Sequence, residues 1–335
     1  MQLPLYTIER GLAIVALLFH AGAFSAAPAI VESLLRYGIW MLILAFLGMR
    51  WKQSIYTLSR DLALLTLLIL IVASWIWSTS PGLTLYFIRE ISQWTMLALY
   101  IASRFSPRQQ VGLLSWMMGI GAVLSVGVSL AVPSIGVHFG DGHDGAWMGV
   151  FSHKNFFGSV MVVSYQVFLL RMLYERSQRW LYRLGCALSL GLILASTSKT
   201  ALMIAVLLTL FIFFYRNFRA QGRVTVLLLI LFSLLLGCVA IVVASNWNEL
   251  LLSLGRDPTL TGRVPIWNYT IDKIAERPFI GYGYGAFWAK DSRYALEAGR
   301  AVAGWTTLDL WIPPHAHNGF IDMALSVGLL GLICF

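Results

Sequence analysis

The sequence carries little charge. Of its 335 residues, 12% are Asp, Glu, Lys or Arg and 59% are hydrophobic, whereas a soluble domain has roughly 25% charged residues. This composition excludes an ordinary soluble protein. Several apolar runs reach the ~20 residues that cross the hydrocarbon core of a bilayer, so we predict an integral membrane protein.

Cysteines and processing signals are also scarce. The three cysteines, Cys186, Cys238 and Cys334, lie in apolar runs without metal-ligand spacing, which argues against a disulfide framework and favours buried spacers. Because no small-residue cleavage site follows a short apolar core near the start, we expect no removable signal peptide. The last apolar run reaches Phe335 with no basic residue after it, as expected of a piece of a longer protein.

The net charge of +9 is explained by membrane topology rather than by nucleic-acid binding. With the N-terminus inside, the predicted cytoplasmic ends hold 13 of the 24 basic residues but only three of the 15 acidic ones. Cytoplasmic loops of membrane proteins carry this excess of Lys and Arg. We therefore expect no nucleic-acid partner.

The apolar runs predict an all-α membrane fold of about ten transmembrane helices. The expected segments are 11–31, 37–49, 61–78, 83–103, 110–132, 156–174, 184–196, 201–215, 224–244 and 316–335. They predict N-terminal transmembrane helices over 1–132, transmembrane helices with short external loops over 133–244, one long external loop over 245–315 and a final transmembrane helix over 316–335.

The long loop is too rich in aromatic and apolar residues for a disordered linker, and we expect it to contain a helix. Thr261 suits the cap of this helix and Pro265 its first turn. Trp267, Ile271 and Ile274 then fall on one face, which we expect to be its apolar face.

The glycine-rich segment 281–285 follows Pro278, where we expect the loop helix to end. It superficially resembles a nucleotide-binding loop, but no strand precedes it and no lysine follows at the required position. We therefore predict a tight turn here and no nucleotide site.

Three cations lie at predicted external positions. Lys199 occupies the turn between runs 184–196 and 201–215, which together predict a helical hairpin; the alternative role is a lysine that merely reaches the membrane interface. Arg263 opens the loop helix, whose N-terminus favours anions; the alternative is a solvated arginine. Lys154 follows His153 where an external loop enters the sixth segment.

The external histidines raise the alternative of a metal site. Their spacing is loose, and a His-x-His pair alone is a weak signal, so polar groups on a loop surface are favoured and no metal is expected. The candidate ligands are His138, Asp141, His143, Asp144, His153, His315 and His317.

Ionisable residues within membrane segments are functional candidates by default. Arg89 and Glu90 lie in the fourth segment and, being adjacent, are expected to point in different directions on a helix; pairing with other helices is the alternative. Asp322 lies about one turn after Asn318 on the same face and is expected to orient that amide or a histidine.

The external cations together with His317 suit a substrate that has a large anionic leaving group and an attacking hydroxyl. Two or three cations stabilise a departing pyrophosphate without a metal. A histidine with a pKa near 6.5 orients or deprotonates the hydroxyl at ordinary pH.

Four motifs in the chain resemble those of the bacterial O-antigen ligase and polysaccharide polymerase family. His317-Asn318, nine residues and Gly328-Leu329-Leu330-Gly331 resemble its His-Asn-x9-Gly-x-x-Gly signature. LTGRVPIWNYTIDKIAERPFIGYGYGAFW resembles its Gly-Arg…Trp…Arg-Pro block, and FSHKNFFG resembles a segment of exopolysaccharide polymerases. STSKTA resembles the turn where many members carry arginine; here it is Lys199. The resemblance covers roughly 145–335.

This resemblance implies a GT-C-like, all-helical, inverting glycosyltransferase in the bacterial inner (cytoplasmic) membrane, with its active site facing the periplasm. The implied donor is an undecaprenyl-pyrophosphate-linked glycan and the acceptor a glycan or lipid A-core, amid membrane lipid and without metal, nucleotide sugar or other cofactor. Lys199 and Arg263 would hold the pyrophosphate, and His317 would engage the acceptor. Lys154, the third external cation predicted above, is expected to join the two pyrophosphate ligands. The expected supporting residues are His153, Asn318, Asp322, His315 and Arg89.

Two other classes of protein remain open on the sequence. A transporter or flippase of lipid-linked oligosaccharide predicts charges spread through the bundle and helix breaks in both halves, whereas the polar residues here gather on one face, mainly in the second half. A purely structural membrane protein leaves the motifs unexplained. Within the glycosyltransferase reading, FSHKN favours a polymerase over a ligase.

Overall fold

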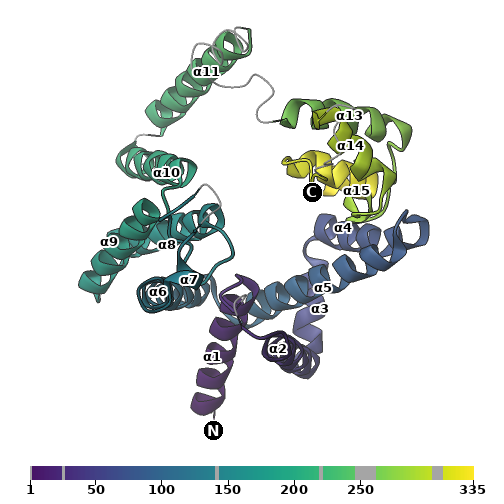
Figure 1. Cartoon of the computed structure of the whole chain (residues 1–335). Coiled ribbons are helices and arrows are strands. Elements are labelled where there is room, and N and C mark those ends of the chain that lie inside the picture. Colours follow the sequence, from purple (N-terminus) through teal and green to yellow (C-terminus); the bar gives the residue numbers. More distant parts are fainter. Residues whose placement is uncertain (1, 25–26, 140–142, 219–221, 246–261, 304–311) are drawn as a thin grey trace. The chain divides into compact units, whose positions relative to one another are not determined.

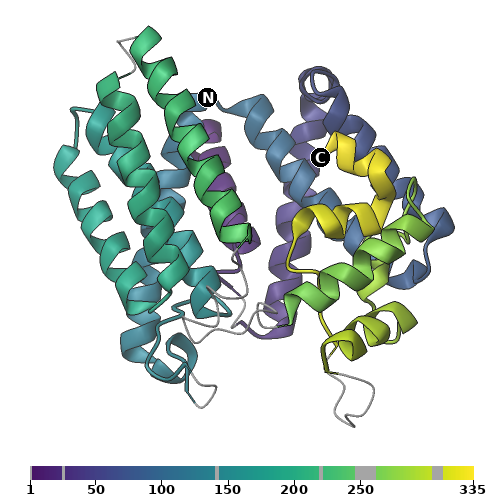
Figure 2. The same ribbon diagram turned by 90° about the horizontal axis from the view of Figure 1, so that it is seen from above.

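The computed structural model describes residues 2–24, 27–139, 143–218, 222–245, 262–303 and 312–335 (Figures 1 and 2). Within these ranges the regular structure is helical, and one isolated antiparallel bridge joins Val137 and Trp147. The chain forms two compact units. The first comprises Met1–Trp51 and Met96–Leu228, and the second comprises Lys52–Thr95 and Leu229–Phe335.

The first unit is a bundle of apolar helices. Its elements are α1 (Gln2–His20), α2 (Ala29–Met49), α6 (Pro107–Ala131), α7 (Pro133–Gly136), α8 (Lys154–Tyr174), α9 (Arg179–Ala195) and α10 (Lys199–Phe218). Fully buried Phe157 and Met161 of α8 pack with Ile193 of α9 and Ala201 of α10. Because α8 contacts both neighbours, it is the centre of this part of the bundle.

The second unit combines apolar helices with the end of the long loop. Its elements are α3 (Trp51–Ser59), α4 (Leu62–Ala73), η1 (Ser74–Trp77), α13 (Arg263–Glu276), η3 (Ala286–Trp288), α14 (Arg293–Ala303) and α15 (Gly319–Cys334). Helices α5 (Pro81–Arg104) and α11 (Arg223–Ser245) contribute residues to both units. The loop has an aromatic core of its own, in which Tyr282, Phe287 and Tyr294 pack with Leu325 of α15.

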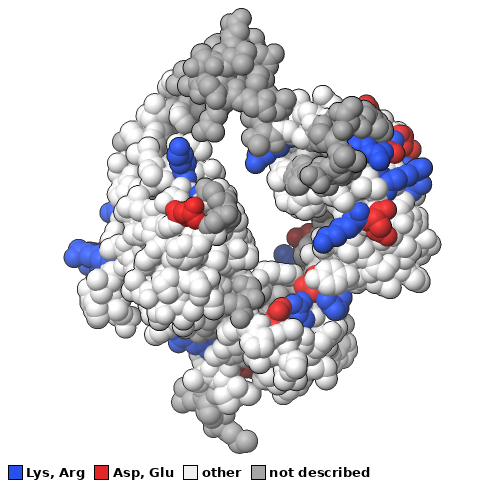
Figure 3. Space-filling view, viewed as in Figure 1, with Lys and Arg blue, Asp and Glu red and all other residues white. Residues whose placement is uncertain are grey.

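The helices include several that fit a membrane. Among the described residues, four helices are long and apolar enough to cross it, namely α2, α6, α8 and α10. Helix α3 with α4–η1 forms a pair bent by 98° that adds a fifth when counted as one span. On the face shown in Figure 3, charged residues gather over α13 and α14, while most of the remaining described surface is uncharged. The chain is therefore a multi-pass helical membrane protein. Each of the ten expected segments overlaps a helix, and ten spans stays a prediction.

The first expected segment, 11–31, was placed too far along the chain. Helix α1 begins at Gln2 and ends at His20. Within this helix Glu9 is fully buried and accepts hydrogen bonds from Arg50 and Arg104. Two cations thus compensate the carboxylate and allow the helix to continue through it.

Candidate functional site

The loop helix α13 places Arg263 at its first position. Its N-cap is Gly262, with φ 83°, and Thr261 lies outside the described residues. Pro265 lies in the first turn, as predicted. Arg263 is exposed, so its guanidinium adds to the positive end of the helix dipole rather than cancelling it.

The predicted apolar face of this helix is right for Ile274, which packs against the aromatic core, and wrong for Ile271. Ile271 is 55% exposed, whereas Ile266 and Thr270 are buried. Thr270 satisfies its hydroxyl by donating to the Ile266 carbonyl at 2.8 Å. A polar residue that bonds within its own helix can be buried, and a pattern based on apolar residues alone overlooks it.

The glycine-rich segment 281–285 is a tight turn that clasps a break in α15. The helix is interrupted at Val327 and Gly328, which has φ 72°. The freed carbonyls of Leu325 and Ser326 accept hydrogen bonds from the N–H groups of Tyr282 (2.7 Å) and Gly283 (3.0 Å). A Cβ on Gly328 would lie 2.1 Å from the Phe279 backbone. The two glycine motifs therefore serve one structural purpose, and the final helix is broken rather than continuous.

A second strip of backbone holds the same turn from the other side. Thr79 N donates to the Tyr282 carbonyl at 2.9 Å, and Tyr284 N donates to Ser74 Oγ at 3.0 Å. The residues of η1 and the connection to α5, more than 200 residues away in sequence, thus hold the turn 281–285 that supports α15.

The loop that carries the two histidines, residues 313–318 (the histidine loop), is pinned at Ala316. Ala316 N donates to Asp322 Oδ1 at 2.9 Å, and the Ala316 carbonyl accepts from Trp267 Nε1 at 2.7 Å. Asp322 Oδ1 also accepts from Trp288 Nε1 at 2.8 Å. Since Trp267 lies about one turn after Arg263, the start of α13 is docked on this loop.

The roles predicted for Asp322 and Asn318 need correction. Asp322 binds the loop backbone and an indole, rather than the Asn318 amide or a histidine ring. Asn318 is the N-cap of α15: its Oδ1 accepts from the N–H groups of Phe320 (3.0 Å) and Ile321 (3.4 Å). Both residues therefore shape the site without facing a substrate through these atoms.

His317 itself is exposed at the tip of the loop, with a left-handed backbone (φ 54°). Its N–H donates to His315 Nδ1 at 3.0 Å, and the two ring centroids are 4.2 Å apart. Partial burial, the neighbouring His315 and the Arg263 guanidinium lower the pKa of His317 from its usual 6.5, while Asp322 opposes them. The imidazole is therefore neutral at pH 7 and able to accept a proton.

Arg89 does not diverge from Glu90 as expected. Its guanidinium pairs with the Glu90 carboxylate at 2.9 Å and lies 4.8 Å from the centroid of the Tyr86 ring. Long side chains on adjacent helical residues can bend toward each other, which the backbone directions alone do not show. The supporting role of Arg89 stays a prediction.

In the first unit, Lys154 and Lys199 are the first residues of α8 and α10. His153 caps α8 by accepting from Asn155 N at 3.1 Å, and Lys154 N donates to His138 Nε2 at 3.1 Å. Lys154 Nζ donates to Thr197 Oγ1 at 3.4 Å. Thr197 belongs to residues 196–200 (the lysine turn), so the structure brings Lys154 to the turn that carries Lys199.

The imidazoles of His138, His143 and His153 gather here, with ring centroids 5.0–5.9 Å apart. Across the described ranges no group of three or more His, Cys, Asp or Glu is arranged to hold a metal ion. Asp141, one of the candidate ligands, lies outside those ranges.

Sequence reasoning missed Trp267 and Trp288 as supports of the histidine loop. Trp267 was assigned to an apolar face, and Trp288 was not singled out. Both indoles lie in the loop region rather than in a membrane run, and an indole N–H usually finds a partner when it is largely buried. A tryptophan outside the membrane runs was therefore the available sequence signal for these two supports.

These features define a multi-pass helical membrane protein with an exposed histidine directly before a broken apolar helix. Residues 184–335 match the family model described as O-Antigen ligase. This region, a little under half of the chain, is similar to the O-antigen ligase family.

Individual relatives extend the comparison. The exopolysaccharide production protein ExoQ of Rhizobium meliloti (strain 1021) is 26% identical over 333 residues, which cover 96% of this chain and 73% of that protein. A Rickettsia conorii protein named as a proposed polysaccharide ligase is 32% identical over 84 residues, covering 24% of this chain and 19% of that protein. One of the same description from Rickettsia bellii is 32% identical over 114 residues, covering 32% and 26%. No solved structure matches significantly.

Proposed function

We propose that the chain is a membrane glycosyltransferase that moves a glycan from an undecaprenyl-pyrophosphate donor to an acceptor hydroxyl. The reaction belongs to polysaccharide polymerisation or ligation, at the periplasmic face of the bacterial inner membrane. The match of residues 184–335 to the O-Antigen ligase model and the names of the relatives, which concern exopolysaccharide production and polysaccharide ligation, support this class. The proposal includes about ten membrane helices in a GT-C-like arrangement.

The observation that carries the proposal is the construction of the histidine loop. His317 is exposed, its pKa is lowered, and its position is fixed by bonds from Trp267 and Asp322 to the residue before it. A general base needs this combination of access, neutrality at working pH and fixed geometry. A merely structural loop needs none of the three.

In the proposed step, the acceptor oxygen attacks the anomeric carbon of the donor. The bond from that carbon to the pyrophosphate oxygen breaks, its electron pair leaves with undecaprenyl pyrophosphate, and the hydroxyl proton passes to a ring nitrogen of His317. Attack opposite to the leaving group inverts the anomeric configuration. No metal is invoked, because cationic side chains stabilise the departing charge.

Arg263 is the proposed pyrophosphate ligand of the second unit. As the first residue of α13 it adds a cation where the helix dipole already disfavours one. A bound anion would interact favourably with both the guanidinium and the positive end of the helix dipole. Lys154 and Lys199, each the first residue of its helix in the first unit, show the same placement, and we propose the same role for them on the sequence prediction.

The test is a turnover assay in liposomes with undecaprenyl-pyrophosphate oligosaccharide and no added metal. Wild-type protein is expected to give lengthened or transferred glycan that chelators do not reduce. His317→Gln keeps a polar side chain of similar reach but no base, and is expected to lose a factor of about 10²–10⁴ in turnover. Its donor binding, measured in parallel, should stay at the wild-type level.

Other outcomes separate the competing functions. A His317→Gln variant that turns over normally would remove the base role, and chelator-sensitive activity would replace the metal-free mechanism. A flippase would move lipid-linked glycan across the bilayer in both variants without forming a glycosidic bond. Product length decides the subclass: stepwise lengthened chains favour the polymerase, and transfer of a finished chain to lipid A-core favours the ligase.

A further inference from the structure

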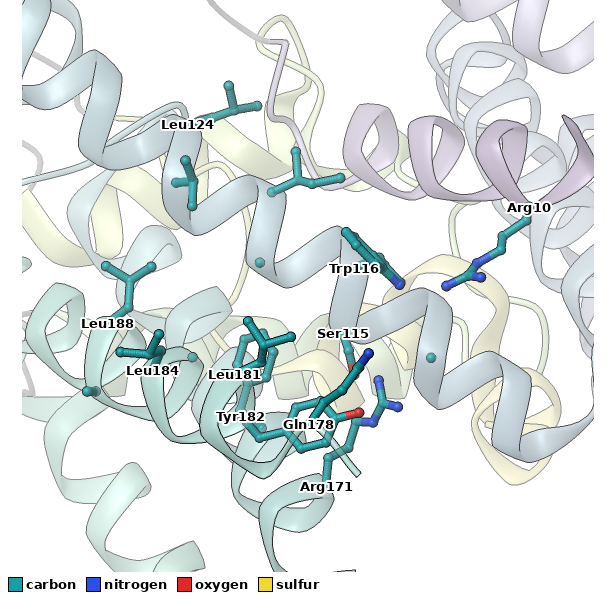
Figure 4. A pocket seen from close by; sticks show the side chains of 17 residues that line it. Arg10, Ser115, Trp116, Leu124, Arg171, Gln178, Leu181, Tyr182, Leu184 and Leu188 are labelled. Carbon is teal, nitrogen blue, oxygen red and sulfur yellow. The ribbon is translucent and has the colours of Figure 1, made fainter. Parts of the chain in front are cut away.

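A cavity of about 1040 Å³ lies within the first unit, bounded by α1, α6, α8 and α9 (Figure 4). Trp116 and Leu124 of α6 and Leu184 and Leu188 of α9 form part of its apolar wall. None of the residues assigned to glycan transfer lines it. The cavity is therefore independent of the proposed active site.

The length of the apolar wall matches one leaflet of a bilayer. Its lining residues on α6 run from Gly112 to Leu124, a helical rise of roughly 18 Å at about 1.5 Å per residue. Half of a hydrocarbon core about 30 Å thick is roughly 15 Å. An acyl chain of a lipid from one leaflet thus fits along this wall.

One end of the cavity is polar and positively charged. Arg10, Arg171 and Gln178 lie there, away from Leu124 and Leu188 (Figure 4). Arg171 pairs with the Glu175 carboxylate at 2.7 Å, and the Arg10 guanidinium lies 5.8 Å from the centroid of the Trp116 ring. Two guanidinium groups against one carboxylate leave this end with a net positive charge.

We propose that this cavity, an open groove along α6 and α9, binds an anionic glycerophospholipid, with an acyl chain along the two helices and its phosphate at Arg10 and Arg171. The arginine distribution predicts that this end faces the cytoplasm, where anionic lipids attract basic residues. The bound lipid is distinct from the lipid-linked donor, whose pyrophosphate is expected at the opposite face. A second apolar helix in the groove would leave the charged end without a counterpart.

The test counts phospholipids bound to the delipidated full chain by native mass spectrometry, after exposure to an equal mixture of phosphatidylglycerol and phosphatidylcholine. Gly112→Phe fills the groove from a position where a Cβ meets nothing within 4 Å. Gly127→Phe is its matched control on the same helix: its Cβ also meets nothing within 4 Å, and it does not line the groove. Arg10→Gln removes one charge without filling space.

We expect wild type and Gly127→Phe to retain phosphatidylglycerol in preference to phosphatidylcholine, and Gly112→Phe to lose it. Arg10→Gln should weaken retention about fivefold, the effect of one basic residue near a charged membrane surface. Equal retention of both lipids, or equal retention by Gly112→Phe and Gly127→Phe, overturns the proposal. A dimer that only Gly112→Phe disrupts overturns it in favour of a protein partner.

Discussion

The histidine loop of the second unit and the lysine turn of the first present their candidate groups by different means. The histidine loop is held by two different helices: Trp267 of α13, which is distant in sequence, and Asp322 of α15 bond the backbone of Ala316. The lysine turn is held mainly by local bonds, besides the bond from Lys154 to Thr197. Ser196 Oγ donates to the Ile193 carbonyl at 2.6 Å and accepts from Ser198 N at 3.3 Å.

This difference matches what the two groups are proposed to do. A base must meet a hydroxyl within about 3 Å and in the right direction, so its loop requires fixation by several elements. A cation that stabilises a leaving group acts as a charge over several ångströms. A locally stable turn at the start of a helix is sufficient for it.

The largest expected effect comes from disturbing the break in α15, which the turn 281–285 supports. Gly328→Ala would place a Cβ 2.1 Å from the Phe279 backbone, at a φ of 72°. We expect a loss of on the order of 3 kcal/mol or more in the free energy of unfolding, measured by thermal unfolding in detergent. Gly319→Ala, on the same helix with nothing within 4 Å, is the matched control. Equal stability of the two variants would show that the break is dispensable.

Neutralising a leaving-group cation comes next. Lys199→Gln and Arg263→Gln are each expected to lower turnover by about 10²–10³, if either stabilises charge on the departing pyrophosphate. Lys199→Arg keeps the charge and adds a bidentate fork, so it should turn over at least as fast as wild type. A change below about threefold in a glutamine variant would end that residue's assigned role.

A smaller effect is expected where only the fixation of the base is weakened. Asp322→Leu removes the acceptor for Ala316 N and Trp288 Nε1 and should lower kcat by about 10², the cost of misplacing a catalytic group by an ångström. Asp322→Asn retains an Oδ1 acceptor and should stay within about tenfold of wild type. Donor affinity should be unchanged in both. If the two variants behave alike, the carboxylate charge matters more than the bonds.

The contrast between the two regions also explains which features the sequence alone revealed. Helices and turns follow from local patterns, so the starts of α8, α10 and α13 at Lys154, Lys199 and Arg263 lie close to where composition and capping residues predicted them. Asp322 and Asn318 were likewise singled out. Their partners were not, because Asp322 reaches Trp288 across 34 residues of chain, and no local pattern encodes that contact.

The break in α15 shows the same limit. An apolar run with two glycines three residues apart predicts a helix, and a break requires knowing that carbonyls freed at Leu325 and Ser326 find N–H partners elsewhere. Those partners lie in the glycine-rich segment 281–285, which was recognised as a turn but not as a clasp. The ion pair that buries Glu9 was hidden for a similar reason, since Arg50 and Arg104 are distant in sequence.

The smallest expected effect is a displacement of the pH profile. Burial, His315 and Arg263 lower the pKa of His317 below 6.5, so the imidazole is neutral at pH 7, and turnover should fall only as the pH drops through that lowered value. Arg263→Gln removes one of these causes and should move the acidic limb of kcat to higher pH, toward 6.5. Lys273→Gln, on the same helix but not among the causes of the shift, should leave the limb in place. An acidic limb that Arg263→Gln does not move would mean that the titrating group is not His317, and the fixed histidine loop would then lose its proposed chemical purpose.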